Sequence, residues 1–201
     1  MYYKYKAYEL IWFFKNFKID EFKSINVSDS EYDVKIEESF KKWNNLPESS
    51  KLSPFLSVFR KEIRLEINGI AKFRIIDGKE IFWIRDNPLI DDKDIKIFLL
   101  GTVMSCILMQ RNFFLLHGNV LEKNNKAIIC LGNSGAGKST IAYFLMQNGW
   151  KVLSDDIAAI NQKGQIYPGI PRIKLWEDAI DEFNINKTNL QTIRKGHKKY
   201  L

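Results

Sequence analysis

Leu131–Thr140 reads LGNSGAGKST, and within it Gly132–Ser139 fits the pattern G-x-x-x-x-G-K-[ST] at every position. Glycines let a backbone wrap closely round a phosphate with its N–H groups pointing inward, and the helix that follows adds partial positive charge. By this pattern Lys138 reaches the β- and γ-phosphates of a nucleoside triphosphate, and the Ser139 hydroxyl can bind Mg²⁺. The alternative is a glycine turn that only joins a strand to a helix.

The residues around this loop give the strand–loop–helix order that phosphate binding requires. Ala127–Leu131 is a short apolar run typical of a buried strand, and a helix is predicted from about Lys138 to Asn148, where Gly149 stops it. Thr140 is more typical of a helix start than of a ligand. The stretch predicted to contact the nucleotide comprises Gly132, Asn133, Ser134, Gly135, Ala136, Gly137, Lys138, Ser139 and Thr140.

Two adjacent carboxylates follow the helix. A strand that begins at Lys151 ends at Asp155-Asp156, and ligands of open α/β sheets bind at the carboxyl ends of strands. One carboxylate is therefore expected to serve Mg²⁺. Because neighbouring residues of a strand point to opposite faces, the second reaches the same place only if the strand ends there. A solvated Asp pair at a strand end or a helix cap is the alternative.

A histidine precedes the glycine loop. Phe113–Leu121 is predicted to be a strand broken at His117-Gly118, and Asn124-Asn125 is predicted to be a turn. A histidine among Phe and Leu is more often a satisfied core residue than a catalyst. The glycine after it permits a close approach of another backbone. The surroundings of His117 alone do not decide whether it is a core residue or part of a functional site.

Two basic segments come after the Asp pair. Tyr167–Trp176, YPGIPRIKLW, is a stiff segment with two prolines that carries Arg172 and Lys174. It either presents cations to a phosphate or peptide, or is a loop with an aromatic anchor. Arg194–Lys199, which contains His197, is more typical of a solvated basic tail than of a site.

The first ninety residues are predicted to form β-structure. Glu62–Arg85 contains Asn68-Gly69 and Asp77-Gly78, dipeptides that favour tight hairpin turns, and so predicts a three-stranded meander. A helix from about 92 to 111 follows, with apolar residues at i, i+3 and i+4 spacing. We therefore predict a β-rich N-terminal lobe at 1–90 and a second domain at 91–201 that begins with this linker helix.

The chain has a net charge of +7 and a pI near 9.2, and its excess of basic residues is unevenly distributed along the sequence. Residues 1–100 carry 18 basic and 17 acidic side chains, whereas residues 101–201 carry 13 and 7. A positive field in the half with the glycine loop suits an anionic nucleotide or an acidic peptide. Arg residues do not cluster with aromatics as in nucleic-acid readers, so no nucleic-acid partner is expected.

The two cysteines, Cys106 and Cys130, lie in apolar runs and are expected to be buried free thiols. The aromatic N-terminus is interrupted by Lys and Glu and lacks the apolar core of a signal peptide. Ile97–Met109 is shorter than the ~20 residues needed to cross a bilayer. We therefore expect a cytoplasmic protein without a membrane partner.

Taken in order, His117-Gly118, GNSGAGKS, LSDD and YPGIPRIKLW resemble the HPr kinase/phosphorylase family. The similarity is closest to the HPr-kinase-like serine kinases of lasso-peptide and other ribosomal-peptide gene clusters. It extends from about Asp33 to Asp178. The resemblance implies an α/β fold, in which a phosphoenolpyruvate-carboxykinase-like P-loop domain follows a small β-rich (α+β) lobe.

The resemblance also implies a reaction: ATP- and Mg²⁺-dependent phosphorylation of a Ser/Thr-type hydroxyl on a peptide or small protein. It makes Asp155 the general base, Asp156 and Ser139 the Mg²⁺ ligands, and Lys138 the residue on the transferred phosphate. His117 then lies beside the Asp pair and orients it.

Two departures from the family are visible. The glycine- and Arg-containing signature that follows the Asp pair in HPr kinase/phosphorylases is absent, which argues against HPr as the substrate. The chain also ends at Leu201, where relatives continue, so a shortened domain is expected. A non-catalytic ATP-binding module or sensor is therefore the alternative to a kinase, with a metabolite kinase as a third reading. Whether the protein forms a homo-oligomer stays open.

Overall fold

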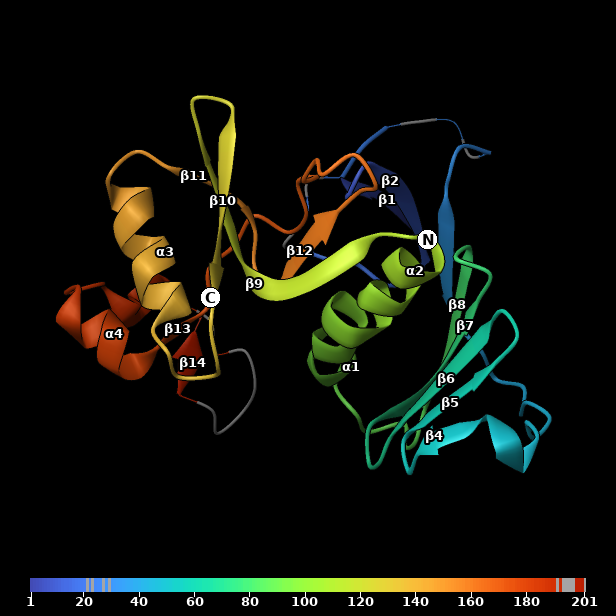
Figure 1. Cartoon of the computed structure of the whole chain (residues 1–201). Helices are drawn as coiled ribbons and strands as arrows, with labels where there is room; N and C mark the ends of the chain where they lie inside the picture. Colours follow the sequence, from blue (N-terminus) through green and yellow to red (C-terminus); the bar gives the residue numbers. More distant parts are fainter. Residues whose placement is uncertain are drawn as a thin grey trace. The chain divides into compact units, whose positions relative to one another are not determined.

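The computed structural model of the chain (Figure 1) describes residues 1–20, 22, 24–26, 28, 30–190, 192 and 198–200. These residues form two compact units, Met1–Phe113 and Phe114–Leu201. The predicted α/β class is confirmed as a mixed, strand-rich fold with few helices. The helix predicted to open the second domain belongs with the first unit, so the unit boundary differs from the predicted one at 90/91.

In the described part of the first unit, eight strands form one sheet with the order β1-β2-β3-β8-β7-β6-β5-β4. The β2–β3 and β3–β8 pairs are parallel, and the other neighbours are antiparallel. The strands are β1 (Tyr2–Ala7), β2 (Leu10–Lys15), β3 (Val34–Glu38), β4 (Lys51–Ser53), β5 (Leu56–Phe59), β6 (Glu62–Ile67), β7 (Ala71–Ile76) and β8 (Glu80–Arg85), with a 3₁₀ turn η1 (Glu48–Ser50) before β4.

The predicted meander is confirmed as β6, β7 and β8. At Asp77-Gly78 both central residues have positive φ, 49° and 64°, as predicted for a tight turn. At Asn68-Gly69 only Gly69 does, with φ of 73°. This turn closes with a hydrogen bond from Ile70 N–H to the carbonyl of Ile67. Its single left-handed residue is at the second central position, as in a type II turn.

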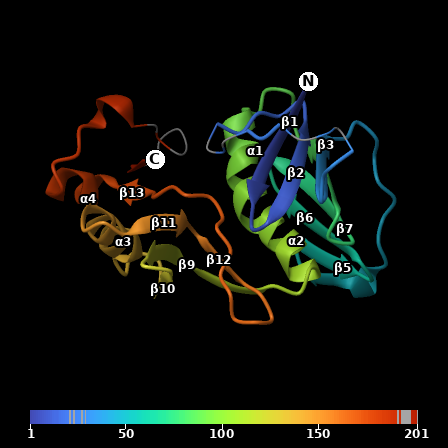
Figure 2. The ribbon, with the colours of Figure 1, turned by 90° about the horizontal axis from the view of Figure 1, so that it is seen from above.

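The predicted helix of residues 92–111 is confirmed as one continuous helical segment. It consists of α1 (Asp92–Phe98), a π-helical turn η2 (Leu99–Val103) and α2 (Met104–Gln110). The Asp91 side chain caps it by accepting a hydrogen bond from Lys93 N–H at 2.8 Å. Figure 2 shows α1 and α2 lying along one face of the sheet, where the apolar stripe of the helix and alternate residues of β7 and β8 are buried: Ile95, Leu99, Val103, Ile107, Phe73, Ile75, Ile81 and Trp83.

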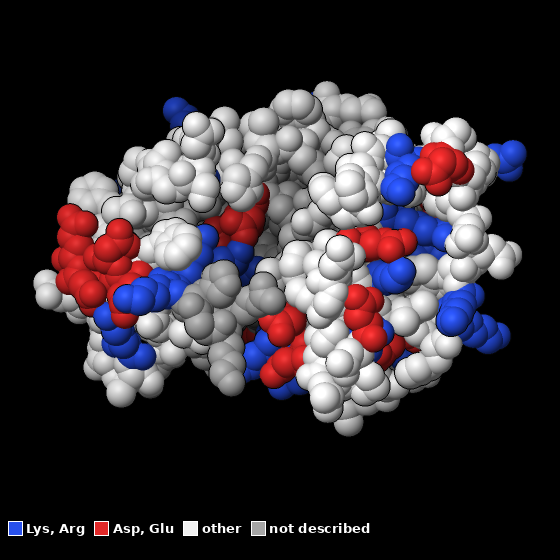
Figure 3. Space-filling model, turned by 90° about the horizontal axis from the view of Figure 1, so that it is seen from below, with Lys and Arg blue, Asp and Glu red and all other residues white. Residues whose placement is uncertain are grey.

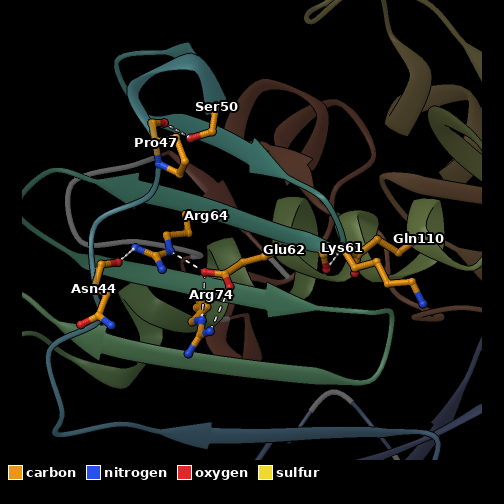
Figure 4. Close-up of polar contacts among 8 residues, drawn as sticks. All are labelled: Asn44, Pro47, Ser50, Lys61, Glu62, Arg64, Arg74 and Gln110. Atoms are coloured by element: carbon orange, nitrogen blue, oxygen red, sulfur yellow. Dashed lines mark hydrogen bonds and ion pairs between the residues drawn. The ribbon is translucent and has the colours of Figure 1, made fainter.

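The end of α2 is tied to the sheet through Gln110 (Figure 4). Its side chain donates to the Lys61 carbonyl at 2.9 Å and accepts from Gly78 N–H at 2.8 Å. Arg111 donates to the Gly78 carbonyl at 2.7 Å. The side chains at the helix end therefore satisfy backbone groups of the hairpin turns.

The second unit is built around β9 (Phe114–Lys123). On one side β9 pairs with β10 (Lys126–Leu131), and on the other with β11 (Lys151–Ser154) and β12 (Ile157–Ile160), always antiparallel. The helix α3 (Lys138–Gln147) follows β10. The remaining elements are β13 (Leu175–Trp176), α4 (Glu177–Glu182), a 3₁₀ turn η3 (Lys187–Asn189) and β14 (Lys199–Tyr200).

One expectation for this unit needs correction. The strand predicted to break at His117-Gly118 is continuous, because Ile157 pairs with His117 on one side and Leu131 pairs with Gly118 on the other. The strand that carries the Asp pair does not pair with β10 directly, because β9 lies between β10 and β11. Both β10 and β11 run opposite to β9, so their carboxyl ends still lie at the same edge of the sheet.

The predicted turn at Asn124-Asn125 is confirmed, with φ of 55° and 61°. Cys106 is buried and Cys130 is half-buried, so the expectation of two buried thiols holds for the first alone; both are free. Burial raises the pKa of the Cys106 thiol to about 11.

In the described parts of the chain, no helix is both long and apolar enough to cross a membrane. Arg194–His197 lies outside the described residues.

Many acidic and basic side chains on the surface lie side by side as ion pairs. On the face drawn in Figure 3, acidic and basic side chains lie next to each other. In the second unit Lys187 pairs with Glu177 at 3.4 Å and with Asp181 at 2.6 Å, and Lys198 pairs with Glu177 at 3.0 Å. Exposed pairs of this kind contribute little to stability.

Glu62 provides a test of the first unit (Figure 4). Burial opposes its ionisation, but hydrogen bonds from Arg74 and Arg64 outweigh burial and hold the pKa of Glu62 below its ordinary value. A lowered pKa stabilises the fold above the unfolded-state pKa, and this stabilisation is lost as the pH falls through the folded-state pKa. We expect Glu62→Gln to cost about 1–3 kcal/mol at pH 7.

The measurement is urea unfolding of both proteins at pH 7 and again in acid. The difference between wild type and variant should shrink as the pH falls below about 4.3, the ordinary pKa of Glu. Glu66→Gln in the same strand is the control, because the Glu66 and Lys72 side chains are each half exposed and the pair is worth about 0.5 kcal/mol or less. A pH-independent loss would contradict the assignment.

Candidate active site

The glycine loop has a left-handed backbone where the sequence places glycine. Gly135 and Gly137 have φ of 83° and 79°, and Gly132 has φ of 153°. Residues other than glycine rarely adopt these φ values. Gly137 is the N-cap of α3 and has no side chain to cap it, so the N–H groups of the first helical turn have no acceptor within the helix. The loop and helix start therefore have the geometry of an anion site.

The predicted phosphate ligands lie at this helix start. Lys138 Nζ donates to the carbonyls of Gly132 at 2.8 Å and Asn133 at 3.0 Å, so its side chain folds back along the loop. The Ser139 hydroxyl lies 3.5 Å from Asn119 Nδ2, which donates to it. Asn119 is buried in β9. The central strand thus orients the hydroxyl predicted to bind Mg²⁺.

The Asp pair forms a tight turn between β11 and β12. Asp155 carbonyl accepts a hydrogen bond from Ile157 N–H at 2.9 Å, which closes a three-residue turn around Asp156, whose φ is 67°. Ser154 Oγ donates to the Ile157 carbonyl at 2.7 Å. Such a turn with positive φ at its centre is rare and strained, and strain of this kind concentrates at functional sites. Because the strand ends at Ser154, the two carboxylates escape strict alternation, as predicted.

His117 and Gly118 hold this turn from the neighbouring strand. The Asp156 carbonyl accepts from Gly118 N–H at 3.2 Å and lies 3.0 Å from His117 Nδ1. His117 is thus adjacent to the Asp pair, but the hydrogen-bond contact of its ring is with the backbone carbonyl of Asp156 and not with a carboxylate. Its side chain is exposed and faces the site, which favours the site reading over the core reading.

Lys174 pairs with both carboxylates. Its Nζ lies 3.6 Å from Asp155 Oδ2 and forms a close hydrogen-bonded ion pair with Asp156 Oδ2. Asp155 is only 4% exposed. Burial, and next the charge of Asp156, raise the pKa of Asp155. Burial opposes ionisation of Asp156 too, but the attraction of Lys174 outweighs it and lowers the pKa of Asp156.

These elements line one small cavity. A space of about 150 Å³ is bounded by the glycine loop, Lys138, Ser139 and Thr140, together with His117 and Asp156. Its volume lies below the ~300–1,000 Å³ of sites that enclose a whole small molecule, so it suits phosphate groups. Four predicted residues do not line the cavity: Gly132, Asn133, Ala136 and Asp155. The carbonyls of the first two accept hydrogen bonds from Lys138.

Sequence reasoning missed several residues of this cavity. Asn119, Trp176, Asp178 and Lys199 also line it. Asn119 had a detectable signal, since a buried polar residue in an apolar strand needs a partner. Trp176 and Lys199 had none, because they meet only through the pairing of β13 with β14.

The residues present suit Mg²⁺ bound together with phosphates. Asp156 and Ser139 supply a carboxylate and a hydroxyl, the oxygen ligands that Mg²⁺ prefers, and such sites usually add substrate phosphates and water. Buried Asp155 Oδ2 accepts no hydrogen bond from the described residues. Among those residues no three His, Cys, Asp or Glu side chains form a metal cluster. A Mg²⁺ ion held by Asp156 and Ser139 would take its remaining ligands from water or from bound phosphates.

Part of the chain is similar to known kinases. Over 49 residues it is 37% identical to the HPr kinase/phosphorylase of Prosthecochloris aestuarii and 35% identical to that of Chlorobium phaeobacteroides. Each match covers 24% of this chain and 14% of the curated relative. No family model and no solved structure matches the chain. The similarity supports an HPr-kinase-like relationship over a short region.

Gly118→Ala tests how closely β9 must approach β10 beside the site. A Cβ at this position would lie 2.5 Å from the Cys130 carbonyl oxygen and 2.9 Å from the Leu131 side chain. Backbone cannot yield as a flexible side chain does, so we expect a loss of about 1–3 kcal/mol in the free energy of unfolding. Urea unfolding followed by circular dichroism measures it.

Gly101→Ala is the matched control, because it lies in the helical segment and its added Cβ would meet nothing within 4 Å. It should leave stability unchanged or raise it by up to ~1 kcal/mol. Equal effects of the two substitutions would contradict the close approach at Gly118.

Proposed function

We propose that the second unit binds Mg-ATP and transfers the γ-phosphoryl group to a Ser/Thr-type hydroxyl of a peptide or small protein. The observation that carries the proposal is the shared cavity of the glycine loop, Lys138, Ser139 and Asp156. A glycine loop at a helix start binds phosphate, and a carboxylate across the same cavity gives the metal a protein ligand. The partial similarity to HPr kinase/phosphorylase supports the same reaction.

The two carboxylates suit different roles because their surroundings differ. The raised pKa of Asp155 favours proton uptake, so we assign it as the general base toward the acceptor hydroxyl. The lowered pKa of Asp156 keeps it ionised, as a Mg²⁺ ligand must be. Bound with the nucleotide, Mg²⁺ neutralises charge on the phosphates. His117 holds the turn that carries both groups.

In the proposed reaction the acceptor oxygen forms a bond to the γ-phosphorus while the bond to the β–γ bridging oxygen breaks, and ADP leaves. The hydroxyl proton passes to Asp155. Lys138, released from the carbonyls of Gly132 and Asn133, places its ammonium group on the transferring phosphate. Positioning and charge stabilisation supply most of the rate enhancement in such reactions.

The acceptor hydroxyl belongs, in this proposal, to a peptide. We propose a ribosomally made precursor peptide with a Ser or Thr near its end, acting in the cytoplasm, and this choice rests on the sequence motifs alone. The departure from the HPr kinase/phosphorylase signature after the Asp pair argues against HPr itself.

Incubation with Mg-ATP and a Ser-ended precursor peptide tests the proposal. We expect the peptide to gain the mass of one phosphate, with ADP formed in equal amount. Asp155→Asn should lower the transfer rate by about 10²–10⁴-fold while ATP binding, measured by calorimetry, is retained. Lys138→Met should abolish nearly all transfer and weaken ATP binding, and Lys163→Met, an exposed lysine in a turn, is the control.

Two results would overturn the kinase assignment. ATP binding without ADP production, whatever peptide is offered, would favour a non-catalytic nucleotide-binding module. ADP release driven by a small metabolite and not by a peptide would favour a metabolite kinase.

A further inference from the structure

We propose that Lys174 is the positioning residue of the Asp pair, holding Asp155 and Asp156 through one oxygen each so that the other oxygen of each is left for the reaction. The inference deepens the proposed function, on which its catalytic part rests. It gives a role to the basic segment Tyr167–Trp176, for which the sequence left two readings open.

The backbone brings Lys174 to the Asp pair. Gly169 N–H donates to the Leu153 carbonyl at 2.9 Å, and Asp155 N–H donates to the Ile170 carbonyl at 3.1 Å. These two hydrogen bonds attach the segment to the chain just before and just after Ser154, the last residue of β11. Four residues after Ile170 the chain delivers an ammonium group to both carboxylates.

The charges explain why a cation is required there. Asp155 and Asp156 are adjacent, Asp155 is almost fully buried and the Asp156 side chain is only 32% exposed, so water screens their repulsion poorly. The Lys174 side chain is only 13% exposed and meets both carboxylates through their Oδ2 atoms. A buried carboxylate without a partner is costly, so Lys174 allows both groups to remain in one turn.

Two other lysines near the cavity make different contacts. Lys138 donates to the loop carbonyls of Gly132 and Asn133. Lys199 Nζ lies 5.4 Å from the centre of the Trp176 ring. Lys138 and Lys199 both line the cavity. Lys174 does not line it and forms ion pairs with both Asp residues. Lys174 is thus placed to orient carboxylates and not to contact the nucleotide.

The test compares Lys174→Met, which keeps the apolar stem and removes the charge, with Lys174→Arg, which keeps the charge. We expect Lys174→Met to lower the transfer rate by about tenfold or more while the affinity for ATP, measured without divalent ion, changes by less than about threefold. Lys174→Arg should recover most of the rate, because a guanidinium can bind two carboxylates at once. Lys163→Met, at an exposed turn lysine outside the cavity, is the control and should leave the rate unchanged.

A stability measurement decides the inference independently of transfer. Thermal unfolding midpoints are compared for Lys174→Met, Asp155→Asn and the double variant. If Lys174 neutralises the pair, Lys174→Met lowers the midpoint and adding Asp155→Asn restores part of the loss, because one carboxylate then no longer faces another without a cation. Simple addition of the two effects would overturn the inference, as would a wild-type transfer rate in Lys174→Met.

The two proposals fail in different ways. If the wild-type protein transfers phosphate to no acceptor, the kinase assignment fails, and the stability cycle still supports or overturns the pairing of Lys174 with Asp155. If transfer occurs but Lys174→Met reduces ATP affinity as much as the rate, Lys174 is a nucleotide ligand and not a positioning residue.

Discussion

The Asp156 carbonyl accepts hydrogen bonds that tie the central strand of the second unit to the turn carrying both carboxylates. Gly118 N–H donates to it, and His117 Nδ1 lies beside the same oxygen. This contact interrupts the pairing of one edge of β9, between β11 and β12, without ending the sheet. It also places the turn that carries the Asp pair beside the stretch of β9 that holds Asn119, whose side chain bonds Ser139. The cavity depends on this single strand for its registry.

Local backbone conformation and charge act together at this turn. A three-residue turn with positive φ frees both carboxylates from alternation, but it leaves two like charges in a poorly hydrated place. Hydrogen bonds from β9 stabilise the backbone, and Lys174 from a separate segment compensates the charge. Neither would suffice alone, because the backbone bonds leave the carboxylates repelling and the ion pair leaves the strained φ unsupported. The opposite pKa directions of the two Asp residues follow from this arrangement.

Much of the local structure followed from the sequence, since glycine turns, caps and apolar periodicity act over a few residues. The meander, the helix after Asp91 and the strand end before the Asp pair are of this kind. Sequence reasoning was wrong where a feature is set by distant pairing. A His-Gly dipeptide resembles a strand break, yet Gly118 lies in the middle of β9. Glycine is required there because the Cys130 carbonyl leaves no room for a Cβ. That contact joins residues twelve apart, and no local propensity encodes it.

The site shows the same division between local and distant information. The glycine loop and the Asp pair are contiguous motifs, so their chemistry is readable before any fold is known. Lys174 lies in a segment whose role the sequence left undecided, because cations near a phosphate site suit either the phosphate or its acidic ligands. What decides it is the pair of backbone hydrogen bonds linking Gly169 and Ile170 to β11. They lead the chain toward the carboxylates, which Lys174 reaches four residues after Ile170, so its charge serves the protein's own acidic side chains before it can serve a ligand.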